Sequence, residues 1–76
     1  MRELVRTNDM VLVSAVEALL EGAGIQHVVL DGNMSVLEGS LGILPRRILV
    51  EDRSLEDARA LLREAGLGHE LRPDGR

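Results

Sequence analysis

The stretch ALLEGAGIQH, residues 18–27, returns later in the chain as ALLREAGLGH, residues 60–69. Each copy has the pattern of a helix end followed by the start of a strand. Gly24 and its counterpart Gly66 suit the left-handed backbone position after a helix, and an apolar residue follows each of them, as in a Schellman motif. The two copies therefore predict a domain of two similar βα halves. Many unrelated helices end in this way, so the repeat leaves open whether the halves share an ancestor.

Two amphipathic helices are predicted upstream of these ends, because apolar residues recur there with the helical period. The first stripe comprises Leu12, Ala15, Val16, Leu19, Leu20 and Ala23, and the second comprises Leu55, Ala58, Leu61, Leu62 and Ala65. Asn8 or Asp9 is expected to cap the first helix. Ser54 with Asp57 three residues later resembles a capping box for the second helix, with Asp in place of the usual Glu.

Four short segments rich in Val, Leu and Ile are predicted strands, namely residues 3–7, 26–31, 47–51 and 69–72. The element order is then βαββαβ. Two βαβ units with right-handed crossovers give an α+β ferredoxin-like sandwich, with two helices on one face of a four-stranded antiparallel sheet in the order 4-1-3-2. We therefore expect a single domain over residues 1–72 with one open sheet face, followed by a loose C-terminal tail at residues 73–76.

The composition favours assembly of several copies. The chain has 76 residues, of which 45% are hydrophobic and none is Phe, Tyr or Trp. A chain of this size buries only about 60% of the surface that its unfolded form exposes, which leaves a thin stability margin. A core made of small aliphatic side chains gains from additional burial between subunits. We therefore expect a homo-oligomer.

Composition also argues against several classes of function. The net charge of −4 gives no general attraction for nucleic acid or anionic membranes, and the aromatic residues with which RNA-recognition modules stack bases are missing. Without Cys or Lys the chain has no disulfide, thiolate metal site, thiol nucleophile or Schiff base. No stretch has the length of a membrane span or the pattern of a leader peptide. We expect a cytoplasmic protein that is not an enzyme and needs no cofactor.

Residues 32–46, between the second and third predicted strands, form a connection that is long for so small a domain and is unusually apolar. Such a segment must cover the open sheet face, extend a strand or meet a partner. Its Gly-rich part, residues 39–42, can turn backbone amides toward an anion, with Arg46 and Arg47 beside it. It matches neither a Walker A loop nor a hydrolase nucleophile elbow. The candidate partner-binding or ligand-binding residues are Ser35, Leu37, Glu38, Gly39, Ser40, Gly42, Arg46 and Arg47.

Metal-binding residue types occur, but their predicted placement argues against a site. His27 and His69 occupy matching positions of the two halves, and the predicted strand order puts them on opposite edges, about 14 Å apart. That separation excludes shared coordination within one chain, whereas a site between subunits stays open. Solvated helix faces and helix caps explain the acidic pairs, which are Glu17 with Glu21, Glu51 with Asp52, and Glu56 with Asp57. No metal site is therefore predicted.

Several runs of the sequence resemble one known family, namely Arg6-Thr7-Asn8-Asp9, Glu17-Ala18-Leu19-Leu20, residues 34–40 and Leu44-Pro45-Arg46-Arg47. Over nearly its whole length the chain is similar to the putative prokaryotic signal-transducing proteins, with Met10 where similar chains often carry Pro. The resemblance implies the ferredoxin-like fold of PII nitrogen regulators and a role in signalling, and it brings no catalytic residues. PII-like proteins use the connection between their second and third strands for ligands and partners.

The sequence leaves three functional hypotheses open. The first is a small bacterial regulatory or interaction module that binds a protein partner through residues 32–47. The alternative is a small-molecule or anion sensor that uses the same Gly-rich loop with Arg46 or Arg47. In the third, the loop only seals the core or a subunit interface.

Overall fold

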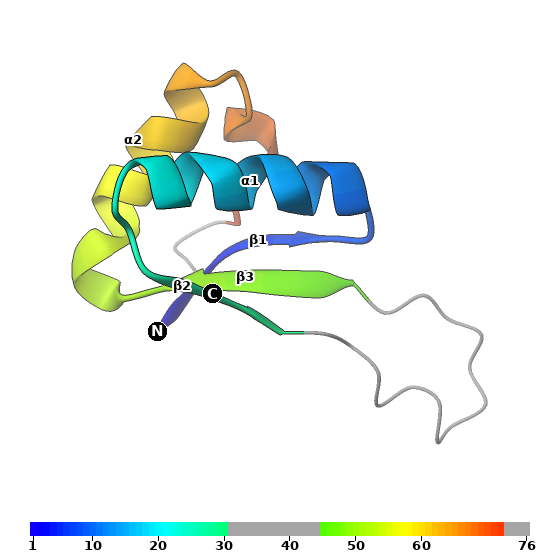
Figure 1. The fold of residues 1–76 in the computed structure, drawn as a ribbon, viewed down its shortest axis with the longest axis horizontal. Helices are drawn as coiled ribbons and strands as arrows, with labels where there is room; N and C mark the ends of the chain where they lie inside the picture. The colour runs from blue at the N-terminus through cyan, green and yellow to red at the C-terminus, as the bar shows by residue number, and fades with distance from the viewer. Residues whose placement is uncertain (31–44, 73–76) are drawn as a thin grey trace.

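The computed structural model describes residues 1–30 and 45–72 of the chain. Its strands and α-helices are β1 (Arg2–Thr7), α1 (Met10–Gly22), β2 (His27–Leu30), β3 (Arg46–Val50) and α2 (Leu55–Glu64). Two short 3-10 helices, Asp52–Ser54 and Gly68–Glu70, precede and follow α2. This order reproduces the predicted βαββα sequence of elements (Figure 1).

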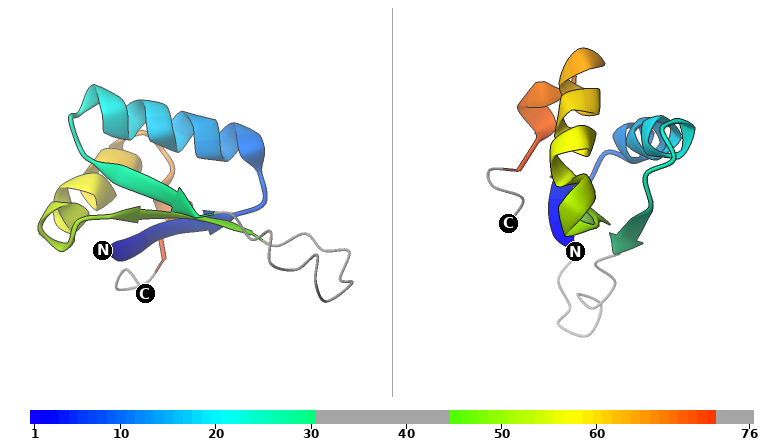
Figure 2. Two further views of the ribbon diagram at one scale, coloured as in Figure 1. Left: turned by 60° about the horizontal axis from the view of Figure 1, so that its bottom comes forward. Right: turned by 90° about the vertical axis from the view of Figure 1, so that its left-hand side faces the viewer.

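The described strands form a three-stranded antiparallel sheet in the order β1-β3-β2. Both helices lie on one face of this sheet, and no described helix covers the other (Figure 2). We call this second face the open face. The fold is therefore α+β, and the central position of β3 agrees with the predicted strand order.

The predicted fourth strand, residues 69–72, is not a strand in the structure. After α2 the chain forms the 3-10 helix Gly68–Glu70, so the backbone amide of Leu71 donates to the Gly68 carbonyl oxygen at 3.2 Å. Only an isolated antiparallel bridge joins Val5 to Leu71, and the Arg72 amide donates to the Leu4 carbonyl oxygen at 3.0 Å. The segment thus lies beside β1, where the fourth strand was expected, but its tight turn leaves too few residues for a ladder. The predicted tail, residues 73–76, lies outside the described residues.

Both helices end as the repeated sequence predicts. Gly24 and Gly66 have φ angles of +73° and +83°. The Ile25 amide donates to the Leu20 carbonyl oxygen at 2.9 Å, and the Leu67 amide donates to the Leu62 carbonyl oxygen at 2.8 Å. These are the long-range bonds of two Schellman motifs, and the apolar residue after each glycine packs against the core.

The two helix starts differ from each other. Asp9 is extended and accepts hydrogen bonds from the backbone amides of Val11 and Leu12 at 2.9 and 3.2 Å, so its predicted capping role is confirmed. The prediction of a capping box at Ser54 is wrong, because the Ser54 side chain makes no capping hydrogen bond. The preceding 3-10 helix holds Ser54 at φ −98° and ψ −3°, which is not the extended conformation that capping requires.

The core lies between the helices and the sheet and is entirely aliphatic among the described residues. Its members are Leu4, Val5, Leu12, Val13, Val16, Leu20, Ile48, Val50, Leu55, Ala58 and Leu62. The predicted stripe of α1 is displaced, because Ala15 and Ala23 are exposed and Val13 is buried. In the part of the chain that the structure describes, no helix is long and apolar enough to cross a membrane.

Candidate functional site

Most of the predicted binding residues fall outside the described part of the chain. Those are Ser35, Leu37, Glu38, Gly39, Ser40 and Gly42. The two described candidates, Arg46 and Arg47, begin β3 and point to opposite faces, because side chains alternate along a strand. Arg46 shares the helix-covered face with buried Ile48, whereas Arg47 lies on the open face.

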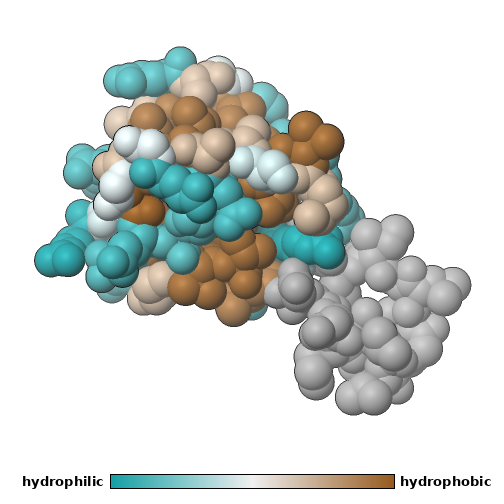
Figure 3. Space-filling model, in the orientation of Figure 1, coloured by the Kyte–Doolittle hydropathy of each residue, from teal (hydrophilic) through white to brown (hydrophobic). Residues whose placement is uncertain are grey.

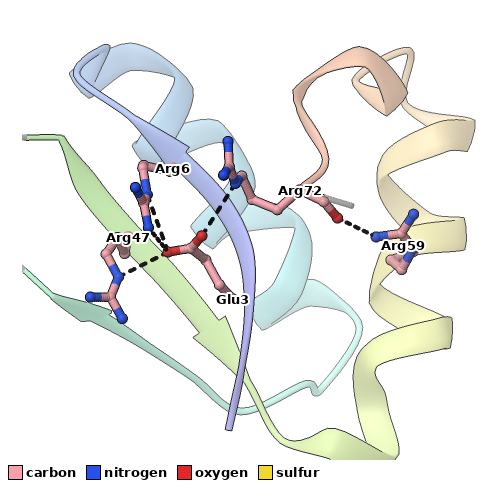
Figure 4. A network of polar contacts seen from close by, with 5 residues as sticks. All are labelled: Glu3, Arg6, Arg47, Arg59 and Arg72. Carbon is pink, nitrogen blue, oxygen red and sulfur yellow. Dashed lines mark hydrogen bonds and ion pairs between the residues drawn. The ribbon is translucent and has the colours of Figure 1, made fainter. Parts of the chain in front are cut away.

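Arg47 belongs to a polar cluster around Glu3, which is only 3% exposed and is the sole buried charged residue in the described ranges. Figure 4 shows guanidinium groups approaching the Glu3 carboxylate from Arg6, Arg47 and Arg72. Glu3 Oε2 lies 2.9 Å from Arg47 Nε and 3.1 Å from Arg6 Nη2, and Glu3 Oε1 lies 3.3 Å from Arg72 Nε. We call these four residues the Glu3–arginine cluster.

A β-bulge creates this cluster. In a regular strand Glu3 and Arg6 would point to opposite faces, because they are three residues apart. The pairing register shifts between Glu3 and Val5, so that Glu3 lies opposite Leu49 and Arg6 lies opposite Arg47. An extra residue in a strand re-aims the side chains that follow it. Glu3 and Arg6 therefore share the open face with Arg47.

Arg72 joins the cluster from the end of the described chain. Its amide pairs with β1 at Leu4, and its carbonyl oxygen accepts a hydrogen bond from Arg59 Nη1 at 2.7 Å (Figure 4). The pairing of this segment with β1, which replaces the predicted fourth strand, thus places a third guanidinium group beside Glu3.

The cluster has more positive charge than its single carboxylate neutralises. The side chains of Arg6, Arg47 and Arg72 are 42%, 43% and 41% exposed. Among the described residues, three buried atoms of the cluster have no hydrogen-bond partner, namely Arg47 Nε, Arg72 Nε and Glu3 Oε1. Both Nε atoms nevertheless lie within ion-pair distance of the Glu3 carboxylate. Three partly exposed arginine side chains therefore surround one buried carboxylate, and guanidinium groups suit a carboxylate or phosphate.

Apolar side chains border the cluster on the same face. Val28 and Leu30 of β2 are 44% and 40% exposed, and they pair with Leu49 and Arg47 of β3. Figure 3 shows apolar surface over β2, next to polar surface. The open face therefore combines exposed aliphatic groups with guanidinium groups a strand away.

The two histidines also have acidic neighbours, which the sequence analysis missed. His27 Nε2 lies 3.0 Å from Glu17 Oε2 of α1, and His69 Nε2 lies 3.2 Å from Glu70 Oε2. Glu17 is thus not simply part of a solvated helix face. Glu17 and His27 lie close together because the Schellman turn folds β2 back beside α1, and their sequence spacing alone does not predict this contact. The contact between Glu3 and Arg6 could have been suspected from the sequence, because two opposite charges occur within an otherwise apolar strand.

Comparison with known proteins matches the chain to one family model. No curated protein matches the chain. The model of one family, described as "putative prokaryotic signal transducing protein", matches residues 1–66 and so covers β1 through α2. The chain therefore belongs to this family.

Proposed function

We propose that the protein is a non-catalytic regulatory module that binds an acidic, partly aliphatic segment of a protein partner on its open face. The observation that carries this proposal is the Glu3–arginine cluster beside exposed Val28 and Leu30. The family description supports a signalling role at the level of the family.

Charge complementarity favours an acidic partner. The chain as a whole has a net charge of −4, whereas the cluster sets three guanidinium groups against one carboxylate. Arg binds carboxylates through two parallel hydrogen bonds, which gives orientation as well as attraction. An acidic segment is thus drawn to this part of an otherwise acidic protein.

The exposed aliphatic residues and the edge of the sheet favour an extended segment. Within residues 1–30 and 45–72, the outer edge of β2 pairs with no strand, so a partner strand has free backbone groups there. In an added strand, alternate side chains face the open face, where Val28 and Leu30 offer apolar contact. Acidic and aliphatic residues in the partner would then meet matching groups.

The first hypothesis from the sequence, that residues 32–47 bind the partner, shares Arg47 with this face. A separate experiment tests that hypothesis: Glu38, Ser40 and Arg46 are replaced together, and partner capture from a bacterial lysate is measured. Unchanged capture by that variant, combined with loss of binding on mutation of the open face, would assign recognition to the open face.

A selection of short random peptides displayed on phage tests the proposed chemistry without knowledge of the natural partner. We expect the selected peptides to be enriched in Asp, Glu and aliphatic residues, and to bind the Val28→Ser and Leu30→Ser variants more weakly. Val11→Ser is the matched control, because Val11 is 78% exposed on α1, away from the open face. Selection of basic peptides, or equal weakening by the control, would contradict the proposal.

A small-anion sensor is the second candidate, favoured by the same exposed guanidinium groups. Thermal-shift measurements with inorganic phosphate, nucleotides and dicarboxylates test it, since an anion at 100 times its Kd adds about 2.7 kcal/mol to the unfolding free energy. A sensor predicts a shift that Arg47→Gln removes and Leu30→Ser leaves unchanged. Absence of any shift would reject this candidate and leave the peptide site standing.

A further inference from the structure

Glu17, Glu21 and His27 bring three metal-ligating side chains together on the helix-covered side of the sheet. Glu17 and Glu21 are one turn apart on α1 and therefore lie on the same helix face. His27 is the first residue of β2, and it pairs with Val50, whose side chain is buried under the helices. One ligand atom from each residue lies within 4.8 Å of the others.

Both ring nitrogens of His27 face an oxygen atom. Its side chain is 10% exposed, with Nε2 facing Glu17 Oε2 at 3.0 Å and Nδ1 facing the Ile25 carbonyl oxygen at 3.5 Å. Metal-binding histidines commonly donate one ring N–H to a backbone carbonyl, which leaves the other nitrogen free to coordinate. In that tautomer, Nε2 and the Glu17 carboxylate would be two acceptors facing each other, and a cation between them would satisfy both.

We infer that Glu17, Glu21 and His27 form a binding site for a divalent transition-metal ion such as Zn²⁺ or Mn²⁺. One imidazole nitrogen and two carboxylate oxygens are the donors that these ions accept, whereas Ca²⁺ and Mg²⁺ prefer oxygen donors throughout. Two donors at about 2.1 Å from one ion are at most about 4.2 Å apart. The exposed side chain of Glu21 closes the remaining gap by a change of rotamer.

The surroundings leave room for further ligands. An open hollow of about 420 Å³ adjoins two of the three residues and is lined by Glu21, Gly24, Ile25, Gln26 and His27. Water or a ligand group in this hollow would complete a four- or five-coordinate ion. The site faces the helix layer and not the open face, although His27 belongs to β2, whose outer edge is the proposed partner-binding edge.

A hydrogen bond from a proton on His27 Nε2 to Glu17 would explain the proximity of these two residues without a metal ion. Mutation of Glu21 distinguishes this hydrogen bond from a metal site. The hydrogen bond needs no contribution from Glu21, whereas the metal site uses its carboxylate. Glu21 is exposed, so Glu21→Gln preserves folding and removes only a charge and a ligand. His69 supplies the control, because this exposed histidine lies 3.2 Å from Glu70 and belongs to no described three-residue group.

The test is titration of the full chain, stripped of metal by a chelator, with Zn²⁺ in a calorimeter and with Co²⁺ in a visible spectrometer. We expect one ion per chain, a Co²⁺ absorption band, and affinity at least about tenfold weaker in Glu21→Gln and in His27→Gln. His69→Gln should bind as the unaltered chain does. Absence of saturable binding, equal affinity in Glu21→Gln, or loss of binding in His69→Gln would overturn the inference and leave the hydrogen bond or an adventitious surface ion as the explanation.

Discussion

Replacing Glu3 with Gln tests the organising role of the Glu3–arginine cluster, because the new side chain has nearly the same shape but no charge. Glu3 is 3% exposed and contacts three guanidinium groups at 2.9 to 3.3 Å. Only the Arg6 contacts have hydrogen-bond geometry. We expect Glu3→Gln to destabilise the fold through loss of these charged contacts.

The magnitude follows from the burial of the partners. Gln still accepts a bond from Arg6, so that contact weakens by about 1 kcal/mol, the difference between a charged and a neutral hydrogen bond. Arg47 and Arg72 are 43% and 41% exposed, and each loses an ion pair worth about 0.5 kcal/mol at such exposure. The expected loss of unfolding free energy is therefore about 2 kcal/mol, or about 8–16 °C in Tm for a domain of this size.

Urea unfolding followed by far-UV circular dichroism measures this loss, since the chain has no aromatic residue for fluorescence. Glu64→Gln is the matched control, because Glu64 is exposed at the end of α2. We expect the control to change the unfolding free energy by less than about 0.5 kcal/mol. Unchanged or increased stability of Glu3→Gln would refute the reasoning, because the cost of burying the carboxylate would then equal or exceed its attraction to the arginines.

Three further predictions concern the fold and use the same unfolding measurement. Asp9→Ala should cost about 1 kcal/mol through loss of two capping bonds, and an equal loss in the control Asn8→Ala would show that the cap is misassigned. Gly24→Ala should cost about 1–2 kcal/mol from backbone strain at φ +73° alone, because the new Cβ meets no atom within 4 Å; a neutral result would contradict the left-handed turn. Leu20→Ala should cost about 2–5 kcal/mol, since Leu20 is fully buried, and a loss below about 1 kcal/mol would mean that the core is not packed as described.

The parts of the fold that could be predicted depend on local signals. Helical periodicity located both helices, and the glycines after them determined both Schellman turns, because that backbone conformation is costly for other residues. Asp9 capped its helix as expected. The strand order followed from the handedness of βαβ crossovers, which is a property of chain geometry and not of particular side chains.

The parts that could not be predicted depend on a shift of register or on contacts between distant elements. Period-two alternation places Glu3 and Arg6 on opposite faces, and only the bulge between Glu3 and Val5 brings them together. The 3-10 helix at Gly68–Glu70 consumes residues expected in a fourth strand. The proximity of Glu17 and His27 depends on how β2 packs beside α1, which no local pattern encodes.

The most direct test of the proposed function is to map where a selected acidic peptide binds, from chemical shifts of the backbone amides in two-dimensional NMR spectra. We predict that the largest shifts occur at Arg6, Arg47, Val28 and Leu30, and that Arg47→Gln weakens binding while Arg53→Gln does not. Arg53 is a suitable control because its side chain is 84% exposed and pairs with Glu51, outside the Glu3–arginine cluster. Shifts confined to the outer surface of α1 around Val11, or equal binding by Arg47→Gln and the unaltered chain, would contradict recognition at the open face.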